Sequence, residues 1–95
     1  MLNDLFDIIL DRKVNPQPGS YTNKLLAANV DAILQKVGEE SVEVILAAKG
    51  QGNQRLVEEV SDLFYHTFVL LVRQGVSLAE VEEELKRRHA AKESK

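Results

Sequence analysis

Apolar residues recur along this chain every three to four positions, which is the spacing of an amphipathic helix. The first segment shows this spacing in Leu2, Leu5, Phe6, Ile9 and Leu10. Residues 2–13 are therefore predicted to form a short helix. Residues 15–20 contain two prolines and a glycine, which are typical of a loop. Either Ser20 or Thr22 can cap a second short helix that ends near Ala28.

A long central helix is predicted next. It begins at Asn29 or Asp31 and ends near the turn at residues 50–52, where Gly50 is well placed as the C-terminal cap. Asn53 is expected to cap a second long helix. Because the connection between the two helices is short, they are predicted to lie antiparallel.

The second long helix, predicted for residues 54–74, is apolar over most of its C-terminal half. Its broad apolar surface includes Phe64, Phe68, Val69, Leu70 and Val72. A helix that is apolar on all sides is buried, and a domain this small buries only about 60–65% of its unfolded surface. We therefore expect a homodimer.

The last helix is predicted after Gly75, which ends the second long helix. Ser77 and Glu80 have the spacing of a capping box at its start, and residues 90–95 are expected to fray at its end. The predicted fold is a single all-α domain, residues 1–95. It is a bundle of about five helices organised by two long antiparallel ones.

Composition and charge exclude several classes of protein. A hydrophobic share of 44% excludes a disordered chain, and a net charge of -3 gives no basic surface for nucleic acid. The absence of cysteine excludes disulfides, a thiolate zinc site and a cysteine nucleophile. The chain shows no positive signal-peptide region and no apolar run of membrane-spanning length. We expect a cytoplasmic protein without a membrane partner.

Two groups of carboxylates lie on the two long helices. Glu39, Glu40 and Glu43 project from one side of the first helix, where like charges at this spacing repel one another. Glu59 and Asp62 are three residues apart on the second helix. In an antiparallel pair the two groups can face each other and form an oxygen-rich site, which suits Mg²⁺ or Mn²⁺ better than zinc. One such pair alone is usually a solvated helix face, but two facing pairs favour a metal site.

The order and spacing of these carboxylates resemble the EExxE…ExxD signature of the all-α, MazG-like nucleotide pyrophosphohydrolases. Here the signature reads Glu39-Glu40-Ser41-Val42-Glu43, fifteen residues, then Glu59-Val60-Ser61-Asp62. Four further stretches resemble one branch, the phosphoribosyl-ATP pyrophosphohydrolases of histidine biosynthesis: Ser20-Tyr21-Thr22 with Lys24-Leu25-Leu26, Lys36-Val37-Gly38-Glu39-Glu40, Ala47-Ala48-Lys49, and Asp62-Leu63-Phe64-Tyr65-His66. The similarity covers about residues 5–89. Asn29-Val30 stands where the family pattern has a glycine-containing turn.

The resemblance implies Mg²⁺-dependent hydrolysis of phosphoribosyl-ATP to phosphoribosyl-AMP and pyrophosphate, with water attacking the α-phosphorus. The implied catalytic residues are the five carboxylates. Four of them are the implied metal ligands, Glu40, Glu43, Glu59 and Asp62. Glu39 is either a further ligand or the group that orients the water.

The resemblance also implies a set of substrate-binding residues: Ser20, Tyr21, Thr22, Lys24, Lys36 and Lys49. Arg55 and Arg73 are weaker candidates for phosphate contacts. Lys36 is equally well explained by an ion pair with Glu40 one turn away. Tyr21 can contact the base or the second ribose, and His66 is expected to be a hydrogen-bonded histidine rather than a ligand.

Two other functions are compatible with these residues. A housecleaning nucleoside triphosphate pyrophosphohydrolase uses the same kind of metal site, and its turnover of ordinary triphosphates distinguishes it. A non-catalytic, dimeric helical interaction module is the second alternative, and it binds no Mg²⁺ saturably. A di-iron bundle is disfavoured because the chain has no paired Glu-x-x-His motifs.

Overall fold

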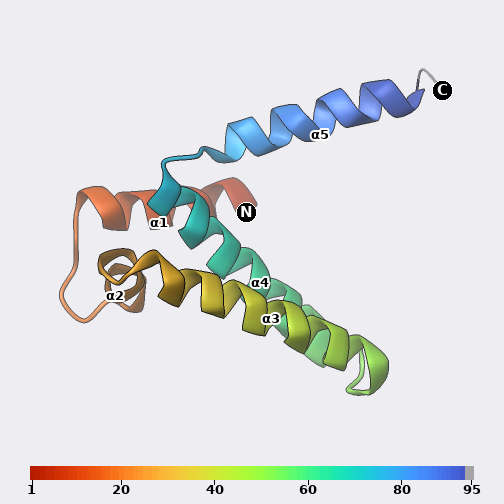
Figure 1. The fold of residues 1–95 in the computed structure, drawn as a ribbon, viewed down its shortest axis with the longest axis horizontal. Helices are drawn as coiled ribbons and strands as arrows, with labels where there is room; N and C mark the ends of the chain where they lie inside the picture. The colour runs from red at the N-terminus through yellow and green to blue at the C-terminus, as the bar shows by residue number, and fades with distance from the viewer. Residues whose placement is uncertain (94–95) are drawn as a thin grey trace.

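The computed structural model describes residues 1–93, which form five α-helices and no strand (Figure 1). The helices are α1 (Leu2–Val14), α2 (Tyr21–Ala27), α3 (Val30–Gly50), α4 (Asn53–Gln74) and α5 (Leu78–Glu93). Figure 1 shows α3 and α4 side by side and antiparallel, with α1 and α2 at one end of the pair and α5 projecting away. The predicted all-α class and the pair of long helices are confirmed.

Local hydrogen bonds define the starts of α2 and α3. The Ser20 hydroxyl oxygen accepts from the backbone N–H of Asn23 at 3.2 Å, so Ser20 rather than Thr22 caps α2. Asn29 Oδ1 accepts from the backbone N–H of Asp31 at 2.8 Å and caps α3. The departure from the family pattern at Asn29 thus supplies an N-cap of its own.

The start of α5 has the predicted capping box. The Ser77 hydroxyl accepts from the backbone N–H of Glu80 at 3.1 Å, and the Glu80 carboxylate accepts from the backbone N–H of Ser77 at 2.7 Å. Gly75 ends α4 with a left-handed backbone, φ 74°. The helix continues to Glu93, so the expected fraying is not seen from residue 90 to 93, and residues 94 and 95 lie outside the described part.

The turn between α3 and α4 differs from the prediction. Gly50 is the last residue of α3 and not its cap, which is Gln51. Asn53 is the first residue of α4, and the N-cap is Gly52, whose φ of 86° favours glycine. The backbone of this tight turn, rather than a side-chain cap, therefore determines where α4 begins.

The core lies where α1, α2 and α3 pack against the C-terminal half of α4. Its buried members are Phe6, Ile9, Leu25, Ile33, Phe68, Val69 and Val72. Three residues predicted to need a partner subunit, Phe68, Val69 and Val72, are thus covered within one chain. The rings of Phe6 and Phe68 meet edge to face at 5.7 Å, which shows that α1 provides part of this cover.

Some apolar side chains remain on the surface. Phe64, also predicted to face a partner, is 42% exposed. Among residues 1–93, no helix is both long and apolar enough to cross a membrane.

Candidate metal centre

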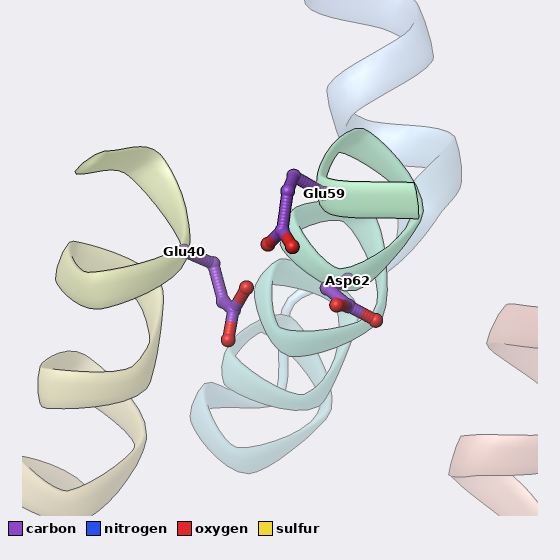
Figure 2. Close-up of side chains that lie close together, drawn as sticks. All are labelled: Glu40, Glu59 and Asp62. Atoms are coloured by element: carbon purple, nitrogen blue, oxygen red, sulfur yellow. The ribbon is translucent and has the colours of Figure 1, made fainter. Parts of the chain in front are cut away.

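Three carboxylates converge between the two long helices. Glu40 reaches out from α3, and Glu59 and Asp62 come from α4 (Figure 2). One ligand oxygen of each lies within 4.8 Å of the others. Glu59 is buried, Glu40 is half-buried and Asp62 is exposed, so the cluster opens to solvent on one side. Oxygen donors at this spacing can bind a metal ion.

The neighbouring carboxylates of this cluster oppose the ionisation of Glu40. Burial raises the pKa of Glu40 above its ordinary value, a hydrogen bond with Glu59 raises it further, and the charge of Asp62 adds to the effect. Glu59 is also ion-paired with the guanidinium of Arg55, which binds Glu58 at 2.8 Å as well. A divalent cation would relieve the same repulsion, so the donor set fits a hard metal ion such as Mg²⁺.

Two of the five predicted catalytic carboxylates lie outside this cluster. Glu43 is half-buried on α3, one turn after Glu40. Glu39 is exposed, and its carboxylate lies 3.8 Å from the ammonium of Lys36. Lys36 therefore forms its ion pair with Glu39 and not with Glu40, the partner that the sequence offered as an alternative.

A pocket of about 450 Å³ lies between α2 and α3. Its lining includes three of the predicted substrate-binding residues, Tyr21, Lys24 and Lys36, together with Glu39. Lysine ammonium groups are common partners of phosphate. The pocket thus combines two cations, an aromatic ring and a carboxylate.

The remaining predicted substrate residues have other positions or partners. Ser20 caps α2, and the Thr22 hydroxyl is hydrogen-bonded to the hydroxyl of Tyr65 on α4. Lys49 is exposed in the last turn of α3, far along the helix from Lys36. Neither Ser20, Thr22 nor Lys49 lines the pocket between α2 and α3.

The two weaker phosphate candidates are engaged within the protein. Arg55 binds two glutamates, as described above. Arg73 Nη1 donates to the backbone oxygen of Ala28 at 2.7 Å and so holds the end of α2 against α4.

His66 has the hydrogen-bonded role predicted for it, but its partners could not be read fully from the sequence. Its Nδ1 lies 2.8 Å from the backbone oxygen of Asp62, and its Nε2 lies 3.1 Å from the Tyr21 hydroxyl. The first contact follows from the four-residue spacing on one helix. The second joins residues 45 positions apart, and no local pattern indicates it.

The chain is similar to known proteins over nearly its whole length. The profile of the family "Phosphoribosyl-ATP pyrophosphohydrolase" matches residues 2–89. The "Phosphoribosyl-ATP pyrophosphatase" of Listeria welshimeri is 56% identical over 88 residues, which are 93% of this chain and 84% of that protein. The protein of the same name from Bacillus cytotoxicus is 48% identical over 88 residues, covering 93% of this chain and 82% of the relative.

A longer relative carries the same similarity in part of its length. The "Histidine biosynthesis bifunctional protein HisIE" of Caldanaerobacter subterraneus subsp. tengcongensis is 48% identical over 89 residues, covering 94% of this chain and 43% of that protein. The match over residues 2–89 and the identities near one half agree with the signature, with the all-α fold and with the carboxylate cluster. The chain belongs to the phosphoribosyl-ATP pyrophosphohydrolase family.

Proposed function

We propose that this protein hydrolyses phosphoribosyl-ATP to phosphoribosyl-AMP and pyrophosphate in histidine biosynthesis, with Mg²⁺ as the cofactor. The observation that carries the proposal is the carboxylate cluster of Glu40, Glu59 and Asp62 on the paired helices of a member of this family. Mn²⁺ has the same preference for oxygen donors and is expected to replace Mg²⁺.

The carboxylates would hold the metal ion that the triphosphate needs. When bound, the ion would neutralise phosphate charge and polarise the phosphoryl group under attack. Glu40, Glu59 and Asp62 are the proposed ligands, and Glu43 stays a predicted ligand although its carboxylate lies outside the cluster. Glu39 borders the pocket rather than the cluster, which favours the role of orienting the attacking water.

The pocket between α2 and α3 is the proposed place of the substrate. Lys24 and Lys36 would donate to phosphate oxygens, and Tyr21 would lie against the base or the second ribose. The pairing of Lys36 with Glu39 at 3.8 Å holds the lysine near the proposed water-orienting group. Ser20 and Thr22 contribute indirectly, because they hold the first turn of α2 in place.

A homodimer is also part of the proposal. Large apolar side chains on α3 and the first half of α4 are exposed: Leu34, Val42, Ile45, Leu46 and Val57. A groove of about 410 Å³ between α1, α4 and α5 adds Leu2, Phe64 and Leu85. A second copy of the chain would cover apolar surface of this extent. The cytoplasmic location expected from the sequence stays a prediction.

Product analysis with phosphoribosyl-ATP and Mg²⁺ tests the activity. We expect stoichiometric pyrophosphate and phosphoribosyl-AMP, with much slower cleavage of ATP and dCTP. Equal turnover of ordinary triphosphates would favour a housecleaning pyrophosphohydrolase instead. Absence of turnover, together with no saturable Mg²⁺ binding in calorimetry, would leave the interaction module as the better explanation.

A further inference from the structure

The imidazole of His66 is not part of the carboxylate cluster, yet both of its nitrogens are engaged. His66 lies one helical turn after Asp62 on α4 and is only 7% exposed. Nδ1 contacts the backbone oxygen of Asp62 at 2.8 Å, and Nε2 contacts the Tyr21 hydroxyl at 3.1 Å. Burial of a polar ring is unfavourable unless its nitrogens are hydrogen-bonded, so the two contacts account for its place in the interior.

The backbone oxygen of Asp62 fixes the direction of both hydrogen bonds. A carbonyl oxygen only accepts, so Nδ1 carries the proton that it receives. In the neutral ring Nε2 is then an acceptor, and the Tyr21 hydroxyl is its donor. The His66 ring on α4 therefore holds the hydroxyl of Tyr21. The backbone oxygen of Asp62 in turn fixes the orientation of that ring.

Tyr21 connects this hydrogen bond to the pocket between α2 and α3. It is the first residue of α2, is 46% exposed, and borders the pocket with Lys24 and Lys36. Its ring stacks on that of Tyr65 at 6.2 Å and meets the ring of His66 nearly at right angles at 6.0 Å. A helix of seven residues is marginal on its own, so such contacts determine where α2 lies.

We propose that His66 is a positioning residue that holds the Tyr21 hydroxyl and thereby sets the wall of the substrate pocket relative to the carboxylates of α4. The inference rests on the proposed function, because it takes this pocket as the place of phosphoribosyl-ATP. His66 acts through Tyr21 and touches no substrate itself. A wall that contacts substrate and transition state alike contributes uniform binding, so its displacement raises KM and leaves kcat nearly unchanged.

Two substitutions at His66 separate this role from a general structural one. In His66→Asn the amide nitrogen takes the place of Nδ1 and keeps a donor for the Asp62 backbone, but no group reaches Tyr21. In His66→Gln the longer side chain brings an amide oxygen toward the place of Nε2, where it can accept from the tyrosine. Tyr21→Phe removes the hydroxyl and keeps the ring on Tyr65.

Steady-state kinetics with phosphoribosyl-ATP and Mg²⁺ measure the effect. We expect KM to rise about two- to tenfold in His66→Asn and in Tyr21→Phe, the range that one neutral hydrogen bond supports. We expect kcat to stay within about twofold of the parent in these variants. In His66→Gln we expect KM to stay close to the parent value. The double variant that combines His66→Asn with Tyr21→Phe should have the KM of Tyr21→Phe alone, because both changes remove the same hydrogen bond.

Melting curves of all variants accompany the kinetics, so that loss of folding is not read as loss of positioning. The inference is overturned if the increases in KM of the two single variants multiply in the double variant, or if kcat falls while KM is unchanged. It is also overturned if His66→Gln raises KM as much as His66→Asn does. If His66→Asn does not fold, Tyr21→Phe decides the matter, and a parental KM in that variant refutes the role. A parent that does not cleave phosphoribosyl-ATP contradicts the proposed function first, and this inference with it.

Discussion

Asp62→Asn is the substitution that separates metal binding from folding at the carboxylate cluster. The change is nearly isosteric and removes one of the three converging charges. Asp62 is exposed, and its side chain forms no ion pair within residues 1–93. Its charge is one of the causes that raise the pKa of Glu40. Without metal, the variant should therefore be as stable as the parent, or more stable by a few tenths of a kcal/mol.

With Mg²⁺ the order of stability should reverse. An ion that binds only the native state stabilises it by about 2.7 kcal/mol when its concentration is one hundred times Kd. If the loss of one of three carboxylates weakens binding about tenfold, the same Mg²⁺ concentration stabilises the variant by only about 1.4 kcal/mol. For a domain of this size the missing stabilisation corresponds to roughly 5–11 °C in Tm.

Melting curves with and without Mg²⁺, at one protein concentration, measure both effects. Asp7→Asn is the matched control, because Asp7 is exposed on α1 and its side chain has no hydrogen bond or ion pair in the described part of the chain. Glu58 is unsuitable as a control because Arg55 binds it together with Glu59. An Asp62→Asn protein that keeps the parent's Mg²⁺-induced shift and turnover would show that Asp62 is not a ligand and that the facing-carboxylate site is wrong.

Three further outcomes are expected. In melts without metal, Glu40→Gln should gain stability relative to the parent as pH rises through the raised pKa of Glu40. The native form of the parent favours the protonated acid, so the parent loses stability as Glu40 ionises, and the glutamine variant does not. A pH-independent difference in stability would contradict this reasoning. Ser77→Ala should lower the free energy of unfolding by about 0.5–2 kcal/mol in urea titrations because the capping box is removed, whereas an unchanged midpoint would show that α5 does not unfold with the rest. Sedimentation at micromolar concentration should give a dimer, and a stable monomer would refute the proposed assembly.

Several features that depend on neighbouring residues could be predicted from the sequence, although the two caps of the α3–α4 turn could not. The cap at Ser77, and the cap at Ser20 as one of two candidates, involve partners three residues away, and the positive φ of Gly75 is a common way to end a helix. The carboxylates of α4 share a face because they are three residues apart. The short turn made α3 and α4 antiparallel, which was enough to bring Glu40 opposite them.

Features that depend on the exact packing of distant segments could not be predicted. Phe68 and Val69 looked like a partner surface because the helical pattern does not reveal that other helices of the same chain cover them. Glu43 was expected in the cluster because its spacing places it on the same face of α3 as Glu40. The spacing does not give the distance from Glu43 to α4, and the carboxylate lies outside the cluster. The Tyr21–His66 contact depends on how α2 docks, which the prolines and glycine of the preceding loop do not determine.

The carboxylate cluster is contained in one helical hairpin, α3 and α4, joined by the two residues between Gly50 and Asn53. Closing so short a connection has a small entropic cost, and contacts of low sequence separation form quickly during folding. The hairpin can therefore bring its acidic groups together before the distant α1 docks on α4. If the hairpin forms first, the charge repulsion between these groups would oppose its formation, and a cation bound there would then change the folding rate as well as the final stability.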